Sequence, residues 1–375
     1  MMLTFREKLT KNFVNSLGWK SNQKYLLIES DDWGTIRMPS YRVYHELIKN
    51  NIPVDQFSFD KHDSLESKDD LEALFQTLTS VQDCKGNPAV LTAYHVMANP
   101  NFEAIEMNGR KEYVYESILD TYKRNIHTLH SYDMIKKGMK MGIYIPQFHG
   151  REHIHVKRWM EAINSESSKE QFAFENKAII STKGKNDECP YKKDYFIGFD
   201  YETDHEAKEI EAIHQDGLRL FKEIFGMKSL TFTSQGSVWG DHLLPMLNHE
   251  SVCLICGQQL HPDGNGGYKV VNKYWGTKNK LGQLYWRRNV LFEPAYNQNF
   301  DWVGKSFAEI EIAFRWRKPA VISTHRENYI GSVFEKNRIQ SLEKLEILLK
   351  KVLYTWPDVQ FISSAQLADI MLKSR

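Results

Sequence analysis

Two adjacent carboxylates, Asp31 and Asp32, stand just after the short apolar run Tyr25–Ile28. Such an uncharged run is typical of a strand buried on both faces of a parallel sheet. Carboxylates so close raise each other's pKa, and a bound cation relieves that repulsion. The pair therefore indicates a metal or acid–base site at a strand end, although it also suits a turn and helix cap that Gly34 completes.

A pair of histidines, His149 and His153, follows a second apolar run, Met139–Pro146. If the segment after this run turns helical, residues four apart lie on one face and the two imidazoles can share one metal ion. The nearby His155 would then point elsewhere. Because the chain has 14 His, this spacing also arises by chance, and its position at a strand end is the stronger argument.

A further histidine, His325, follows the apolar run Pro319–Thr324. Ligands bind at the carboxyl ends of strands in α/β sheets and barrels, so we expect the three groups to share one site. One carboxylate and two imidazoles hold a divalent cation with open positions, which leaves a second carboxylate free as a general base. Taken alone, His325 also suits a structural histidine.

Expected strands alternate with expected helices along the chain, which favours an α/β fold with a parallel sheet or barrel. The expected strands are Tyr25–Ile28, Pro88–Val96, Met139–Pro146, Ser229–Thr233, Ser251–Ile255, Leu284–Phe292, Pro319–Thr324 and Val359–Ile362. The expected helices are Tyr41–Lys49, Leu71–Val81, Tyr201–Phe225, Lys305–Trp316, Glu335–Tyr354 and Ser364–Leu372. We expect a single domain over residues 1–375, with residues 101–131 and 257–283 as insertions or a lid.

Composition narrows the class of protein. A net charge of +1 argues against nucleic-acid and membrane partners, and no apolar segment suits a signal peptide or a membrane span. A cytoplasmic location is therefore expected, and four Cys fit a reducing compartment. Cys253 and Cys256 lie three apart in the apolar run SVCLICG. If that run is a strand, they face opposite sides, which favours buried structural cysteines over a metal or redox pair. The oligomeric state is not predicted.

The order of these motifs resembles the polysaccharide deacetylase family, also called carbohydrate esterase family 4, within the glycoside hydrolase/deacetylase superfamily. That family pairs two Asp after its first strand, an HxxxH after a middle strand and a His after a late strand. The chain more closely resembles the bacterial deacetylase-like group that lacks a secretion signal. The resemblance implies an α/β fold, a distorted (β/α)7-type barrel with insertions on the C-terminal face of the strands.

The resemblance also implies roles for the residues. Asp31 resembles the catalytic base and His325 the general acid, whereas Asp32, His149 and His153 resemble the metal ligands. The implied cofactor is a divalent metal, with Zn²⁺ the best suited, although Co²⁺, Ni²⁺ or Fe²⁺ fits the same two-His-one-carboxylate set.

The chain departs from the family pattern at two motifs. The stretch TSQGSVW, residues 233–239, lacks the Arg of the third motif, so Arg287 or Arg288 is expected to orient Asp31, and Arg287 is the one that we assign. For the acidic residue that tunes the acid His, Glu293 or Asp301 is the expected substitute. The expected substrate-binding residues are Trp33, Trp239, Trp286 and Glu293, although Arg287 also suits a salt bridge and Trp33 and Trp239 also suit the core.

The function that these features favour is metal-dependent deacetylation of an N- or O-acetylated sugar or glycan. One alternative is a hydrolase of another C–N bond or a glycosidic bond on the same barrel. Another is a carbohydrate-binding protein with a degenerate site, against which the complete Asp-Asp, HxxxH and His set argues.

Overall fold

The computed structural model describes residues 3–166, 168–181, 194–264 and 267–374. Within these ranges, nine parallel strands form one sheet in the order β10-β7-β6-β5-β2-β1-β12-β11, with β13 also paired to β1. The strands are β1 Tyr25–Trp33, β2 Leu91–Val96, β5 Tyr144–Gly150, β6 Thr231–Phe232, β7 Leu254–Cys256, β10 Leu284–Trp286, β11 Val290–Leu291, β12 Ala320–His325 and β13 Gln360–Phe361.

The two edge strands of the sheet are consecutive along the chain, which shows that the sheet curls round on itself. Edge strand β10 ends at Trp286 and the opposite edge strand β11 begins at Val290, so only residues 287–289 connect the edges. A short connection of this kind requires the two edges to approach each other. The predicted α/β fold with a distorted barrel is confirmed, and this connection is the seam of the barrel.

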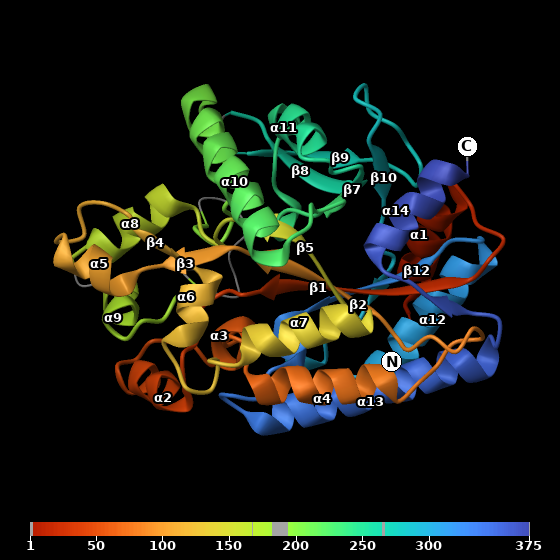
Figure 1. Ribbon diagram of the computed structural model, residues 1–375, viewed down its shortest axis with the longest axis horizontal. Coiled ribbons are helices and arrows are strands. Elements are labelled where there is room, and N and C mark those ends of the chain that lie inside the picture. Colours follow the sequence, from red (N-terminus) through yellow and green to blue (C-terminus); the bar gives the residue numbers. More distant parts are fainter. Residues whose placement is uncertain (1–2, 167, 182–193, 265–266, 375) are drawn as a thin grey trace.

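Helices surround the sheet. In Figure 1, α4, α7 and α13 lie on one side of it, whereas α10 and α11 lie on the other. The helices are α1 Phe5–Ser16, α2 Tyr41–Lys49, α3 Ser58–His62, α4 Lys68–Thr79, α5 Phe102–Met107, α6 Ile118–Lys123, α7 Ser131–Met141, α8 Val156–Asn164, α9 Lys169–Glu175, α10 Asp204–Phe225, α11 Leu244–His249, α12 Trp302–Arg315, α13 Glu335–Thr355 and α14 Ser364–Lys373.

Strand β1 lies in the middle of the sheet, between β2 and β12. Leu26, Leu27 and Ile28 are each at most 1% exposed, which explains why this stretch has no charge. Both faces of a central strand in a barrel pack against apolar side chains. The register pairs Asp31 of β1 with His325 of β12, so the chemistry-bearing end of β1 lies beside that of its neighbour.

Two expected strands differ most from those observed. Helix α7 continues to Met141, and β5 begins only at Tyr144, so the prediction of a strand over Met139–Pro146 was wrong at its start. Gly142 ends the helix with a φ of 73°, a left-handed conformation that glycine adopts without strain. The expected strand Leu284–Phe292 is in fact two strands, β10 and β11, separated by the seam.

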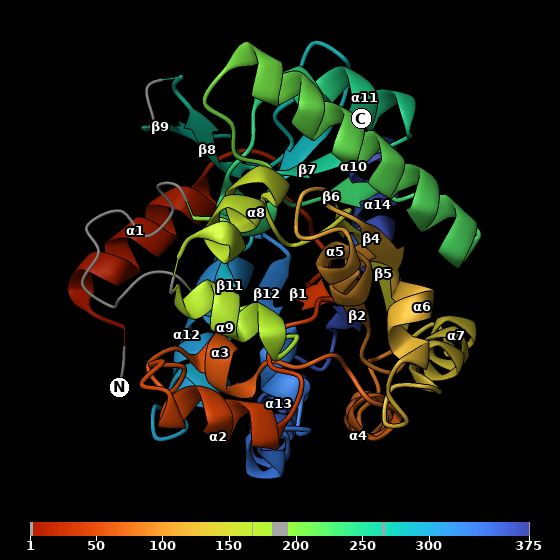
Figure 2. The same cartoon turned by 90° about the vertical axis from the view of Figure 1, so that its left-hand side faces the viewer.

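The carboxyl ends of the strands meet on the side that Figure 2 faces, where helices and small ribbons follow them. The ribbons are β3 Ala98–Pro100 with β4 Tyr115–Ser117, and β8 Gln258–Pro262 with β9 Tyr268–Asn272. These two ribbons lie at or near the expected insertions, residues 101–131 and 257–283. Residues 265–266 of the second insertion lie outside the described ranges. The single domain and the lid stay predictions.

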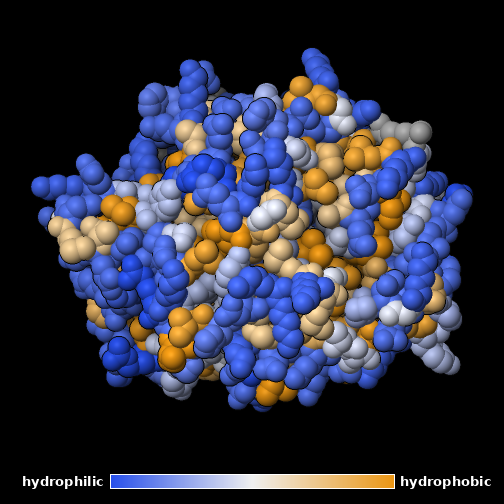
Figure 3. Space-filling view, in the orientation of Figure 1, coloured by the Kyte–Doolittle hydropathy of each residue, from blue (hydrophilic) through white to orange (hydrophobic). Residues whose placement is uncertain are grey.

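The outer surface is largely polar. On the face in Figure 3, hydrophilic side chains cover most of the area and hydrophobic residues show between them. Over the part of the chain that the structure describes, no helix has the length and apolarity needed to cross a membrane. The cytoplasmic location stays a prediction.

Candidate active site

The structure brings Asp32, His149 and His153 together in a buried group. Their ligand atoms all lie within 4.8 Å of one another. Asp32 Oδ1 is 2.9 Å from His153 Nε2 and 3.4 Å from His149 Nε2. Asp32 has a φ of 73°, a left-handed conformation that costs a non-glycine residue about 1–3 kcal/mol. Backbone strain at this point is consistent with a functional demand on the direction of the carboxylate.

His149 and His153 approach Asp32 through a turn, not through a helix. His149 belongs to β5, and helix α8 starts only at Val156, so the helical condition under which the pair would share one face is not met. Gly150 turns the chain with a φ of 125°, and a Cβ there would lie 2.7 Å from Gln235 Nε2. A glycine is therefore needed at this position.

Gln235 holds this turn in place. Its Nε2 donates hydrogen bonds to the backbone oxygens of His149, at 2.9 Å, and of Glu152, at 2.7 Å. Its Oε1 accepts from the backbone N–H of Gly198 at 2.7 Å. Because every polar atom of this buried amide is used, the turn that presents His153 is fixed from the far side of the site. Gln235 was not among the residues predicted from the sequence, although it lies in the stretch compared with the third family motif.

The hydrogen bond of His149 fixes its tautomer. Nδ1 lies 2.9 Å from the backbone oxygen of Thr233, which can only accept, so Nδ1 carries the proton. Nε2 is then the ring nitrogen directed at Asp32, as in metal-binding histidines with such a partner.

The three residues fit a divalent metal. Ligands about 2.0–2.2 Å from a tetrahedral ion are about 3.3 Å apart, close to the contacts of Asp32 with the two imidazoles. Two imidazoles and one carboxylate are a donor set that Zn²⁺ and neighbouring transition metals accept. The geometry therefore agrees with the predicted ligand set, and metal binding itself belongs to the proposal below.

Asp31 faces a different partner from its neighbour Asp32. Both of its carboxylate oxygens accept hydrogen bonds of 2.6 Å from the two Nη atoms of Arg288. The Nε of the same guanidinium donates to Glu29 at 2.7 Å. Burial raises the pKa of Asp31, but Arg288 outweighs it and the resulting pKa lies below the ordinary value. Asp31 is therefore a fixed, ionised carboxylate beside the candidate metal ligands.

The assignment of Arg287 as the residue that orients Asp31 was wrong, and Arg288 has this position. Arg287 instead donates to Asn272 Oδ1 at 3.1 Å, and its guanidinium lies 5.7 Å from the centre of the Tyr274 ring. Neighbouring side chains in an extended segment point to opposite sides, so only one of the two arginines can face the site.

His325 ends β12 next to Asp31 and pairs with Glu293. Its Nδ1 is 2.7 Å from Glu293 Oε1, and Asn328 Nδ2 donates to the other Glu293 oxygen at 2.6 Å. Burial lowers the pKa of His325, but the Glu293 carboxylate, followed by Asp32 and Asp31, raises it to about 10. The expected tuning residue is thus Glu293. It is fully buried behind His325, so it does not form the substrate contact for which it was also predicted.

A titration tests the pairing of His325 with Glu293. In metal-free protein, Glu293→Gln should lower the pKa of His325 from about 10 towards 6.5, because the neutral amide no longer stabilises the imidazolium. In the wild type, the pair stabilises the fold fully below pH 6.5, and this contribution is lost as the pH rises through about 10. NMR of the His325 ring over this window checks both statements. The exposed Glu311→Gln serves as control, and an unshifted His325 would show that the pair does not set its charge.

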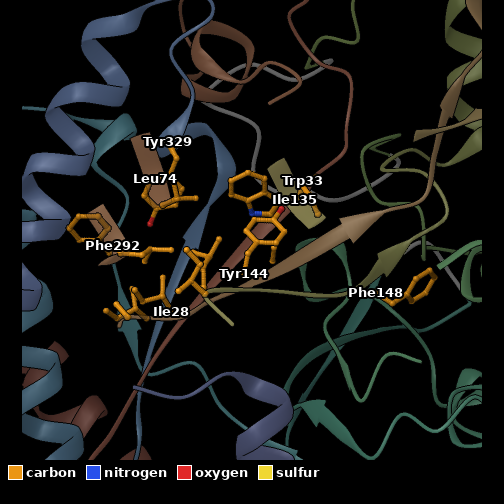
Figure 4. Packing of buried hydrophobic residues seen from close by; sticks show 14 of the residues in the cluster. Ile28, Trp33, Leu74, Ile135, Tyr144, Phe148, Phe292 and Tyr329 are labelled. Carbon is orange, nitrogen blue, oxygen red and sulfur yellow. The ribbon is translucent and has the colours of Figure 1, made fainter. Parts of the chain in front are cut away.

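The three tryptophans predicted to bind substrate lie in the core instead. Trp33, Trp239 and Trp286 are each at most 1% exposed. Figure 4 shows the Trp33 ring beside Tyr144, with ring centres 5.3 Å apart in an edge-to-face contact. The Nε1 of Trp33 donates to Ser30 Oγ at 2.9 Å. The aromatic-rich composition thus serves packing at these positions.

A polar cavity of about 350 Å³ lies over the strand ends and is lined by Asp31, Arg288 and His325. Thr233, Ser234 and Gln258 add uncharged hydrogen-bonding groups to its wall. A larger cavity of about 590 Å³, lined in part by Ile36, Met38 and Phe102, contains none of the predicted site residues. The smaller cavity is therefore the candidate substrate cleft.

No protein-family model and no curated protein matches the sequence. Among solved structures, a candidate glycoside hydrolase/deacetylase from Parabacteroides distasonis matches with a TM-score of 0.49 at 8% identity, over 95% of this chain and 72% of that one. A candidate polysaccharide deacetylase from Mycobacterium smegmatis matches with a TM-score of 0.43 at 10% identity, over 96% and 93%. The 4-alpha-glucanotransferase of Thermococcus litoralis matches with a TM-score of 0.43 at 8% identity, over 94% of this chain but only 40% of its own length.

Proposed function

We propose that this protein is a metal-dependent hydrolase that removes an acetyl group from an N- or O-acetylated sugar or glycan. One observation carries the proposal. A buried carboxylate and two imidazoles converge on one point, while a second carboxylate, Asp31, is held ionised beside them and His325 lies on the adjacent strand. An acid, a base and a cation site so arranged suit hydrolysis of an unreactive carbonyl compound.

Asp32, His149 and His153 would hold the cation, with Zn²⁺ the best match to the donors. A bound divalent ion supplies a Lewis acid that polarises the acetyl carbonyl and makes water more acidic. The residues around it determine where protons travel.

Asp31 accepts the proton of the attacking water. Its carboxylate is ionised because Arg288 lowers its pKa, and the two-pronged contact fixes its direction. Glu29 holds the third donor of the same guanidinium, so Arg288 is anchored by one carboxylate while it orients the other.

His325 donates a proton to the departing amine or alcohol. Its Nδ1 is committed to Glu293, so Nε2 is the nitrogen free to serve the cleft that His325 lines. Because Glu293 raises its pKa, the imidazole stays protonated at neutral pH and can act as the acid.

Acetate release tests the proposal. Purified protein loaded with Zn²⁺ should release acetate from a panel of N- and O-acetylated sugars and oligosaccharides, and chelation followed by Zn²⁺ addition should abolish and restore the activity. Cleavage of glycosidic bonds without acetate would instead identify the alternative hydrolase. Sugar binding without any hydrolysis would identify a binding protein.

Adjacent arginines give a matched pair of variants. Arg288→Lys should lower kcat by about 10- to 100-fold, because an ammonium keeps the charge but cannot hold both oxygens of Asp31. Arg287→Lys should stay within about twofold of the wild type, because Arg287 touches neither Asp31 nor the cleft. Steady-state acetate release measures both. Equal losses in the two variants would contradict the role given to Arg288.

A further inference from the structure

Lys11 reaches the catalytic cleft from outside the barrel. It belongs to α1, the helix that precedes the first strand, and it lines the cleft together with Asp31 and His325. Its Nζ donates to the backbone oxygen of Asn289 at 2.8 Å, so the side chain crosses to the seam of the barrel. The side chain remains 29% exposed. A lysine in this place is anchored and still accessible from the cleft.

Lys11 shares its buried carboxylate partner with a second lysine. Its nearest carboxylate is Glu309, whose Oε1 lies 3.2 Å from Lys11 Nζ and 2.7 Å from Lys305 Nζ. The other Glu309 oxygen accepts from the backbone N–H of Leu291 at 2.7 Å. Two ammonium groups therefore share one buried carboxylate. An ammonium has three donors, and Asn289 with Glu309 uses two of those of Lys11.

The other two cations of the cleft, Arg288 and His325, have no charge to spare, and His325 is paired with Glu293. Arg288 binds two carboxylates, those of Asp31 and Glu29, which together exceed its own charge. Among the described residues that line the cleft, Asp31 is the acidic one, and none is Trp, Tyr or Phe. Within this cavity a sugar therefore meets hydrogen-bonding and charged groups and no aromatic ring.

We infer that Lys11 binds an anionic substituent of the substrate, so that the preferred substrates are acidic acetylated sugars bearing a carboxylate or a phosphate near the acetyl group. This inference rests on the proposed function, because it specifies the substrate of the same site. The third donor of Lys11 would supply a charge-assisted hydrogen bond to that substituent.

Matched substrates test the inference. One pair compares an N-acetylhexosamine with its N-acetylhexosaminuronic acid, and a second compares it with its 6-phosphate. Wild-type protein should have a kcat/KM at least about 10-fold higher for an acidic member than for the neutral one. The pair that shows this preference distinguishes carboxylate from phosphate. Equal kcat/KM values within both pairs would overturn the inference.

Variants of two lysines on α1 are assayed with the same matched substrates. Lys11→Met should reduce the acidic-to-neutral ratio of kcat/KM by about 10-fold, mainly through KM, and Lys11→Arg should keep the ratio near that of the wild type. Lys8→Met, an exposed position on the same helix, should leave both rates unchanged. An unaltered ratio in Lys11→Met would overturn the inference.

Two further measurements keep the test decisive. If Lys11→Met fails to fold, rising salt should lower wild-type kcat/KM for the acidic substrate and not for the neutral one. If no substrate releases acetate, the proposed function fails separately. Calorimetry then compares glucuronate and glucose 6-phosphate with glucose. Tighter binding of an acidic sugar to the wild type than to Lys11→Met would support the inference, and equal binding would reject it.

Discussion

His149→Ala should empty the metal site. Wild-type protein dialysed against metal-free buffer after loading is expected to retain about one equivalent of Zn²⁺, and the variant less than about a tenth of one. The reason is geometric. His149 supplies an imidazole whose Nδ1 proton is held by Thr233, and loss of one of three protein ligands leaves the cation with Asp32 and His153 alone. Elemental analysis of the dialysed proteins measures the difference.

An exposed histidine provides the control for this variant. His205 lies on the surface of α10, with its side chain 83% exposed, so His205→Ala should keep the full equivalent. Circular dichroism establishes that His149→Ala is folded. Full metal content in a folded His149→Ala protein would contradict the proposed ligand set.

Asp31→Asn should separate turnover from metal binding. The variant is expected to retain its equivalent of metal, because Asp31 contacts Arg288 and is not part of the ligand group. Its kcat should fall by about 10²- to 10⁴-fold, because an amide cannot accept the proton of the attacking water. Acetate release and elemental analysis on the same sample give both quantities.

The same substitution at the neighbouring Asp32 should affect metal binding as well. Asp32→Asn should lose metal as well as turnover, since Asp32 Oδ1 is the carboxylate atom that meets both imidazoles. Two adjacent aspartates would then differ in what they do, although they are identical in type. If Asp31→Asn also lost its metal, the division between ligand and base would be wrong.

The sequence alone was sufficient to predict the architecture and the central group of residues. The apolar run before Asp31 and the carboxyl-end rule for parallel strands place the carboxylate pair, the histidine pair and His325 at one edge of the sheet. This inference needs only strand identity and direction, and small errors in strand bounds do not affect it. The start of β5 was misplaced, yet His149 still lies at its end.

The wrong predictions concern the direction in which single side chains point and the packing around them. Choosing between Arg287 and Arg288 requires knowing which way each points from the seam, and the break between β10 and β11 carries no clear sequence signal. The burial of Trp33, Trp239 and Trp286 depends on residues distant in sequence. The sequence near a strand end therefore does not distinguish a sugar-binding tryptophan from one in the core. Gln235 was missed because its partners are backbone groups, which any residue type can supply.

The central claim is that Asp32, His149 and His153 bind one cation while Asp31 stays free beside it. Diffraction from Zn²⁺-loaded crystals, recorded at the zinc absorption edge, tests it most directly. The expected result is one anomalous peak about 2.0–2.2 Å from Asp32 Oδ1 and from the Nε2 atoms of both histidines, with Asp31 still bound to Arg288. A peak that lies elsewhere, or one that Asp31 ligates in place of Asp32, would contradict the account.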